Sequence, residues 1–350
     1  RQYDFACIAA ISHGTVLMLF LDLMPAEARQ FDGFYADFEL AALQIGIENP
    51  KGYYEIVFCA AVWIIRQRKI SPIDVWVQGI SGGQGSGKST FAMLLKLVFE
   101  RVHGLRVLTL SLDDFYLTLK ERKALSEQVT PLLETRGVPG THDVNLMNHI
   151  IADVCANRQT QVPRFDKAID DREQDLEIVD AGVDILIVEG WCLGATGYSQ
   201  SDIQQQQLCD PVNTLESIED KDYIWRRYVN SQLTGEGYQA LFRSFGGLFY
   251  LAIPDWEAVM QWRSLQETKL VAAKAQHLDS KTRLSDENGE HDQASGEIKT
   301  MDRSGIERFI MFYERLTKKM LVETSKTADF TFSLNKEHEF FSVHANVSSP

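Results

Sequence analysis

The chain has 350 residues, of which 45% are hydrophobic and 24% are charged, so it can bury a sizeable core. This composition excludes an intrinsically disordered chain, a collagen-like repeat and a small scaffold held by disulfides. The 35 basic and 49 acidic residues give a net charge of −14. Proteins that bind a nucleic-acid backbone need a basic surface, so nucleic acid is not expected as the main partner.

The five cysteines show neither a C-x-x-C pair nor a spacing with histidine that would suggest a zinc site. We therefore expect reduced thiols, in the cytoplasm or in an organelle with reducing conditions if a targeting segment has been removed. The longest apolar stretch, residues 16–24, contains Asp22 and is too short to span a bilayer. We interpret it as a buried N-terminal helix rather than a targeting segment, and we expect no membrane partner.

Residues 1–72 are predicted to form a helical extension that packs on the core. Apolar residues recur in it at helical spacing, from Phe38 to Ile45 and again from Val57 to Ile64. Residues 73–350 are predicted to form the main domain, in which short β-rich runs alternate with helical segments. This alternation is typical of an α/β fold in which helices cover both faces of a sheet.

Five runs in the main domain have the apolar character of strands that are buried on both faces. We therefore predict a five-stranded parallel sheet, with strands at residues 75–80, 106–111, 183–188, 248–253 and 329–334. Two polar segments interrupt the pattern, residues 199–222 and 276–305, and we expect both to be surface insertions or mobile loops. A solvated linker is the simpler interpretation of each segment, and a lid that closes over a substrate is the alternative.

The strongest motif is G-x-x-x-x-G-K-[ST], which the chain matches with Gly82-Gly83-Gln84-Gly85-Ser86-Gly87-Lys88-Ser89. It follows an apolar strand and precedes a helix with apolar residues at helical spacing. Glycines let the backbone curl so that successive N–H groups point at phosphate oxygens, and the helix N-terminus adds a favourable dipole. We therefore predict that the loop, extended to Thr90, binds ATP, with Lys88 reaching the β- and γ-phosphates and Ser89 binding Mg²⁺.

Carboxylates follow two further strands, at the edge of the sheet where ligands bind in open α/β folds. The second strand ends in Ser111-Leu112-Asp113-Asp114-Phe115-Tyr116, and the third ends in Ile187-Val188-Glu189-Gly190-Trp191. A carboxylate after the second strand can accept the proton of an attacking hydroxyl or help to hold Mg²⁺, and Glu189 stands where an acid would hold the metal or its water. Acids that only cap a turn or lie on the surface are the alternative interpretation.

Basic residues lie between these carboxylates, in Arg136-Gly137-Val138-Pro139-Gly140-Thr141-His142-Asp143, in Pro163-Arg164-Phe165-Asp166-Lys167 and at Arg172. Arginine can donate two parallel hydrogen bonds to a carboxylate or a phosphate, so these residues suggest anion recognition. Ordinary surface charge is the alternative for Arg164 and Lys167. For His142, a structural role is about as plausible as a catalytic one.

Together these motifs resemble the superfamily of phosphoribulokinase, uridine kinase and pantothenate kinase. Within it, segments 136–143, 163–167 and 188–194, together with Trp262-Arg263, resemble the D-glycerate 3-kinase family. The resemblance runs from about residue 73 to the C-terminus. It implies a P-loop NTPase three-layer sandwich with a five-stranded parallel sheet and a helical lid, which uses ATP and Mg²⁺ to phosphorylate a small molecule.

The reaction that this resemblance implies is phosphoryl transfer from ATP to the 3-hydroxyl of D-glycerate, giving 3-phospho-D-glycerate and ADP, as in photorespiration. Because the catalytic acid of similar kinases stands two residues before an aromatic residue, Asp113 is the implied general base. The implied catalytic residues are Lys88, Asp113 and Glu189, and the implied Mg²⁺-binding residues are Ser89, Asp113 and Glu189. The residues implied at the acceptor pocket are Asp114, Tyr116, His142, Asp143, Arg164, Lys167 and Arg172. No lid residue is transferred, because segment 276–305 interrupts that region.

Other functions stay open at this point. The same chemistry can act on pantothenate, a nucleoside or a sugar phosphate, and the sequence does not indicate the oligomeric state. A nucleotide-dependent switch is a second class, but GTPases read guanine with Asn-Lys-x-Asp, and here His338 follows Asn335-Lys336-Glu337. Glu189-Gly190 also stands where a switch would carry Asp-x-x-Gly. A nucleic-acid enzyme is disfavoured by the net charge of −14.

Overall fold

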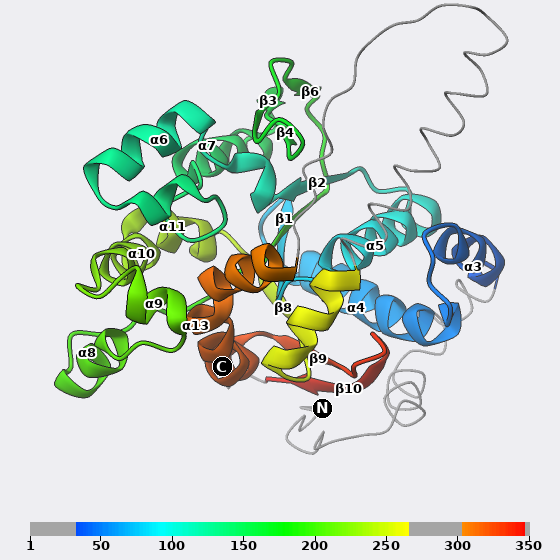
Figure 1. Ribbon diagram of the computed structural model, residues 1–350. Helices are drawn as coiled ribbons and strands as arrows, with labels where there is room; N and C mark the ends of the chain where they lie inside the picture. Colours follow the sequence, from blue (N-terminus) through cyan, green and yellow to red (C-terminus); the bar gives the residue numbers. More distant parts are fainter. Residues whose placement is uncertain (1–32, 266–302, 347–350) are drawn as a thin grey trace, which may run out of the picture.

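A computed structural model describes residues 33–265 and 303–346 (Figure 1). Its centre is a six-stranded sheet with the strand order β10-β9-β8-β1-β7-β2. Neighbouring strands from β2 to β9 are parallel, whereas β10 runs antiparallel to β9. The strands are β1 (Trp76–Gly82), β2 (Val107–Ser111), β7 (Ile185–Gly190), β8 (Gly247–Ala252), β9 (Phe330–Leu334) and β10 (Phe340–Ala345).

The five predicted strands are confirmed and are parallel, but the prediction of a five-stranded sheet missed β10. That prediction relied on continuous apolar runs, which are typical of strands buried on both faces. In β10 only Phe340 and Val343 are buried, and Phe341 is 50% exposed. An edge strand with one face toward solvent carries polar residues such as Ser342 and His344, so it lacks the apolar signal.

Helices cover both faces of the sheet and complete three layers, as predicted (Figure 1). On one face, α3 (Tyr35–Gln44), α4 (Pro50–Ile70) and α5 (Lys88–His103) share an apolar core with Trp76 of β1. On the other face, Val77 of β1 joins a second core, because successive strand residues point to opposite faces. The helices of this second core are α7 (Val144–Cys155), α10 (Ile224–Thr234), α11 (Glu236–Arg243) and α13 (Arg303–Thr327).

A long excursion joins β2 to β7 and folds back over the carboxyl end of β2. It contains η2 (Leu112–Phe115), α6 (Leu119–Gln128), η3 (Pro131–Glu134) and α7, then two small antiparallel sheets formed by β3 (Thr160–Val162) with β6 (Glu177–Val179) and β4 (Phe165–Asp166) with β5 (Asp171–Arg172). The backbone N–H of Asp143 donates to the carbonyl of Phe115 at 2.7 Å. This bond places the end of segment 136–143 beside the residues that follow β2.

The polar segment 199–222, which was expected to be a surface insertion or a mobile loop, contains regular secondary structure. The segment holds two helices, α8 (Asp202–Cys209) and α9 (Thr214–Ile218). The buried carboxylate of Glu216 accepts hydrogen bonds from Arg315 of α13 at 2.8 and 2.6 Å, and Asp220 accepts one from Arg226 of α10 at 2.8 Å. Two of its acids, Glu216 and Asp220, are therefore buried by pairing with arginines at the second core, although they look like surface residues in the sequence.

Residues 276–302 of the other polar segment lie outside the described residues, as do the predicted lid and the apolar stretch 16–24. A helix that starts at Trp256 is described as far as Leu265, and α13 starts at Arg303. Within the described ranges, no helix is long and apolar enough to cross a membrane.

Candidate active site

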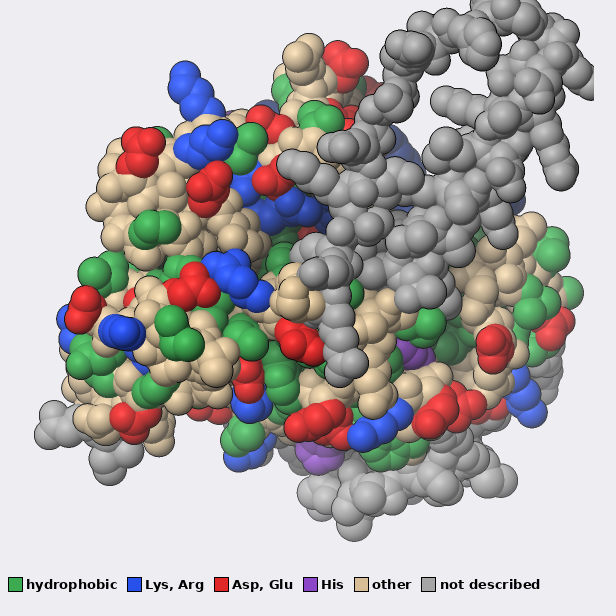
Figure 2. Space-filling view, viewed as in Figure 1, with side chains coloured by type: hydrophobic (Ala, Val, Ile, Leu, Met, Phe, Trp, Pro, Cys, Tyr) green, Lys and Arg blue, Asp and Glu red, His purple; other side chains and the backbone are tan. Residues whose placement is uncertain are grey.

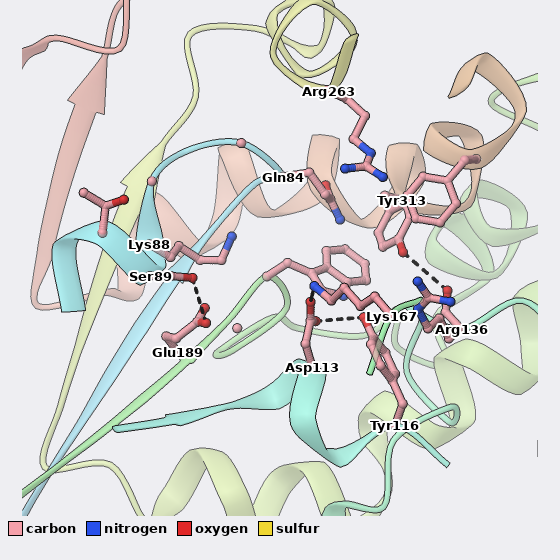
Figure 3. Close-up of a pocket in the computed structure, with 16 residues that line it drawn as sticks. Gln84, Lys88, Ser89, Asp113, Tyr116, Arg136, Lys167, Glu189, Arg263 and Tyr313 are labelled. Carbon is pink, nitrogen blue, oxygen red and sulfur yellow. Dashed lines mark hydrogen bonds and ion pairs between the residues drawn. The ribbon is translucent and has the colours of Figure 1, made fainter. Parts of the chain in front are cut away.

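A cavity of about 320 Å³ opens at the carboxyl ends of β1, β2 and β7 (Figure 3). Its wall is formed by the loop after β1, the excursion, the end of β7, the helix at 256–265 and α13. Figure 2 shows basic side chains recessed in a hollow between the excursion and α13. The charged lining comprises four basic residues (Lys88, Arg136, Lys167 and Arg263) and two acidic ones (Asp113 and Glu189), so this acidic protein has a positively charged cavity.

The loop between β1 and α5 has the conformation of a phosphate-binding loop. Gly85 and Gly87 have φ angles of +79° and +82°, which L side chains rarely adopt. No described side chain caps the N-terminus of α5, so its first N–H groups stay available for an anion. The Lys88 ammonium donates to the carbonyl of Gly83 at 3.0 Å. Burial lowers the pKa of Lys88, while neighbouring carboxylates oppose this shift.

The Ser89 hydroxyl lies beside the predicted metal carboxylate. Its Oγ donates to Oε1 of Glu189 at 2.9 Å (Figure 3). Glu189 is nearly buried, and its position in β7 pairs with Ile80 of β1 and Ser111 of β2. Mg²⁺ prefers oxygen ligands and usually binds one or two protein groups together with substrate phosphates and water. These two oxygen groups fit that ion, and the described residues hold no cluster of three metal-ligating side chains that would suggest another metal.

Asp113 lies in η2, directly after β2, and its carboxylate faces the cavity (Figure 3). The Tyr116 hydroxyl donates to its Oδ1 at 2.7 Å, and the Lys167 ammonium donates to its Oδ2 at 2.7 Å. Burial alone would raise the pKa of Asp113, but the charge and hydrogen bond of Lys167 and the bond from Tyr116 lower it to about 2. Asp113 is therefore an ionised, oriented carboxylate opposite the phosphate-binding loop.

Among the seven residues predicted at the acceptor pocket, only Tyr116 and Lys167 line this cavity. Asp114 instead accepts hydrogen bonds from Nη1 of Arg164 at 2.7 Å and from the backbone N–H of Phe165 at 3.3 Å. Arg164 also pairs with Glu177 of β6. These opposite charges are paired with each other, so they fix the excursion on η2 rather than face a ligand.

Arg172 and Asp143 are also paired outside the cavity wall. Arg172 donates through Nε to the carbonyl of Tyr116 at 2.7 Å and through Nη2 to Asp143 at 3.4 Å. The other carboxylate oxygen of Asp143 caps α7 by accepting from the N–H of Leu146 at 3.0 Å. Both residues thus hold the backbone behind Tyr116, and the structure does not place them among the residues that line the cavity.

His142 lies behind Tyr116 and is 5% exposed. The two rings stack with centroids 4.7 Å apart, and Nδ1 of His142 is 2.7 Å from the Tyr238 hydroxyl. That hydroxyl already accepts the backbone N–H of Gly140 at 3.0 Å, so its own proton is free to go to Nδ1. Burial lowers the pKa of His142 to about 4, although the charge of Asp113 opposes the shift. His142 is therefore a neutral support for Tyr116.

Three residues on the opposite wall were not among the predicted site residues: Arg136, Arg263 and Tyr313 (Figure 3). Arg136 pairs with Asp170, and the Tyr313 hydroxyl donates to the Arg136 carbonyl at 3.4 Å. The Arg263 guanidinium lies over the Phe309 ring, 5.4 Å from its centroid. Arg136 and Arg263 stood in segments noted for the family resemblance. Nothing in the sequence marks Tyr313, because it looks like any buried residue of a long helix.

The outer side of the phosphate-binding loop is covered by the turn between β9 and β10. Nε2 of His338, in that turn, lies 2.9 Å from the carbonyl oxygen of Gly85. The His338 ring stacks on Trp262, with centroids 4.0 Å apart. The hydroxyl of Tyr53 in α4 donates to the carbonyl of His338 at 3.4 Å. The N-terminal helices thus reach the nucleotide loop through this turn.

No family model matches the chain. The uncharacterized kinase mug58 of Schizosaccharomyces pombe is 31% identical over 208 residues, which cover 56% of this chain and 72% of that protein. The probable ATP-dependent kinase TDA10 of Saccharomyces cerevisiae is 30% identical over 210 residues, which cover 55% of this chain and 67% of that protein.

Among solved structures, the D-glycerate 3-kinase from Cryptococcus neoformans var. grubii superposes with a TM-score of 0.64 and is 23% identical in sequence. The alignment covers 83% of this chain and 99% of that chain, so the two proteins share a fold. One assignment of family and activity follows from three findings: the glycine loop, the ionised carboxylate across the cavity and the two yeast relatives. The chain belongs to the family of P-loop kinases that includes mug58 and TDA10, and it is an ATP-dependent kinase of a small molecule.

Proposed function

We propose that this kinase phosphorylates D-glycerate at its 3-hydroxyl. The observation that carries the proposal is the charge of the cavity, where Lys167, Arg136 and Arg263 lie across from Lys88 (Figure 3). Cations placed there suit an acceptor that carries its own anionic group next to the hydroxyl. A 2,3-dihydroxy acid has this chemistry, and the fold shared with a D-glycerate 3-kinase supports the choice.

In the proposed reaction, the 3-hydroxyl oxygen forms a bond to the γ-phosphorus of ATP, and the bond from that phosphorus to the β,γ-bridging oxygen breaks. The hydroxyl proton passes to the Asp113 carboxylate, and ADP leaves with the electron pair of the broken bond. Lys88 and the N–H groups of the loop stabilise the negative charge of the phosphates. Ser89 and Glu189 would hold Mg²⁺, which when bound neutralises charge on the β- and γ-phosphates.

The low pKa of Asp113 is compatible with this role. Its ammonium partner, Lys167, has a side chain that is 60% exposed, so it can turn toward an arriving carboxylate. An acceptor that draws Lys167 away removes the positive charge that lowers the pKa of Asp113. Asp113 becomes a better base only when the anionic acceptor is present, which couples acceptor binding to proton transfer.

The test compares ATP-dependent phosphorylation of D-glycerate with that of pantothenate, uridine and ribulose 5-phosphate by the release of ADP, and it identifies the product formed from D-glycerate with a 3-phosphoglycerate-specific coupled assay. We expect turnover on D-glycerate, loss of activity in Lys88→Ala, and a fall of about 10²- to 10⁴-fold in Asp113→Asn with ATP binding retained. Asp114→Asn is the matched control, because this neighbouring carboxylate does not line the cavity. Turnover on another acceptor, or a normal rate in Asp113→Asn, would contradict the proposal.

A further inference from the structure

Gln84 lies in the phosphate-binding loop, and its side chain lines the cavity. Its neighbours cannot carry side chains there: a Cβ on Gly83 would lie 3.0 Å from Ile253, and a Cβ on Gly85 would lie 2.8 Å from Trp262. Figure 3 shows the Gln84 amide pointing into the cavity. Between Gly83 and Gly87, Gln84 is therefore the residue whose polar side chain lines the space next to Lys88.

The amide of Gln84 is buried but unsatisfied. Its oxygen and its nitrogen are both shielded from solvent, and neither has a hydrogen-bond partner among the described residues. A buried polar group without a partner usually costs about 1–3 kcal/mol, and most such groups in folded proteins find a partner. An amide that is desolvated inside a ligand cavity without protein partners is placed to bind the ligand.

The position of the Gln84 amide indicates which part of a bound ligand it would contact. Figure 3 shows it between Lys88 on one side and Arg263 and Tyr313 on the other, with Asp113 across the cavity. Lys88 approaches the β- and γ-phosphates in P-loop kinases, and Asp113 is the proposed acceptor of the hydroxyl proton. The space between them is where the γ-phosphoryl group and the attacking hydroxyl meet.

We propose that the Gln84 amide binds the transferring phosphoryl group and the attacking hydroxyl together. This inference rests on the proposed function. The NH₂ group donates to an oxygen of the γ-phosphoryl group, and the carbonyl oxygen accepts from the acceptor hydroxyl until that proton passes to Asp113. Gln84 itself gains and loses no proton. A carboxamide suits this position because it is neutral and has both donors and an acceptor, whereas a carboxylate would repel the phosphoryl group and an ammonium cannot accept.

The test uses the full chain and three variants, Gln84→Ala, Gln84→Glu and Gln84→Asn, the last of which keeps the amide but shortens its reach. Affinities for ATP and for ADP are measured by displacement of a fluorescent nucleotide, and transfer to D-glycerate is measured beside ATP hydrolysis. We expect Gln84→Ala to lower the rate of transfer by about 10²- to 10³-fold, as loss of one transition-state donor does elsewhere. Its affinity for ADP should stay within about threefold, because the amide faces the γ-phosphoryl group.

Gln84→Glu should lower the affinity for ATP by about tenfold more than the affinity for ADP, since its charge opposes the γ-phosphate. Gln84→Asn should resemble Gln84→Ala. A normal rate of transfer in Gln84→Ala, or equal loss of ATP and ADP affinity in Gln84→Glu, would overturn the inference. The ratio of the two affinities needs no acceptor. If the wild-type protein does not use D-glycerate, only the proposed function fails, and the affinity ratio still decides the role of Gln84 toward the phosphoryl group.

Discussion

Acidification should destabilise this protein through His142. The loss of unfolding free energy can be calculated from the pKa shift that burial causes in this residue. The pKa of this histidine falls from 6.5 to about 4 on folding, mainly because burial disfavours its charged form. In the unfolded chain the His142 imidazole binds a proton below pH 6.5, whereas in the folded protein it stays neutral until the pH falls to about 4. Stability is lost as the pH falls through this window. The full difference corresponds to about 3 kcal/mol, and about 2.5 kcal/mol is reached at pH 4.5.

The measurement is urea unfolding followed by tryptophan fluorescence between pH 7.5 and pH 4.5, for the wild-type protein and for His142→Asn. Asparagine keeps an acceptor for the Tyr238 hydroxyl but does not titrate, so the variant should lose about 2.5 kcal/mol less than the wild type over this range. His149→Asn, at a histidine of α7 whose side chain is 73% exposed, is the control and should follow the wild type. If His142→Asn also follows the wild type, His142 is not buried in its neutral form.

Two further predictions concern the cavity wall. Gly137→Ala should destabilise the protein by about 1–3 kcal/mol in thermal or urea unfolding and raise the acceptor KM, because φ is +133° and the new Cβ would lie 2.0 Å from the Tyr313 hydroxyl. Gly104→Ala, also at positive φ but with no atom within 4 Å, should leave KM unchanged. Lys167→Met should raise the acceptor KM by about 10- to 100-fold and leave the affinity for ADP in place, since a charge-assisted hydrogen bond is worth about 1.5–3 kcal/mol. Equal effects on both ligands would contradict that role for Lys167.

The sequence predicts those parts of the site that depend on local geometry. A glycine loop needs its glycines within a few residues, and strands buried on both faces need continuous apolar runs, so the loop at 82–89 and the five parallel strands were found. Asp113 and Glu189 could be placed at the same edge because parallel strands end together. The contact between Glu189 and Ser89 then follows from that edge.

Contacts between distant segments could not be predicted in the same way. Arg164, Arg172 and Lys167 look alike in sequence, but only Lys167 reaches the cavity, because acids from other parts of the excursion pair with the two arginines. Tyr313 enters the site only because α13 crosses the sheet beside Gly137. The buried acid Glu216 of α9 looked like a surface residue because its partner, Arg315 on α13, lies 99 residues away along the chain.

The bond from Tyr53 to the β9–β10 turn affects how the chain can be divided. A fragment that starts at residue 73 would contain every nucleotide motif but would lack α3 and α4. Part of the first apolar core would then face water, and the turn that contacts Gly85 would lose its anchor on α4. The unit that can be expressed alone, fused to another protein or exchanged between kinases therefore has to include α3 and α4, well ahead of the first strand.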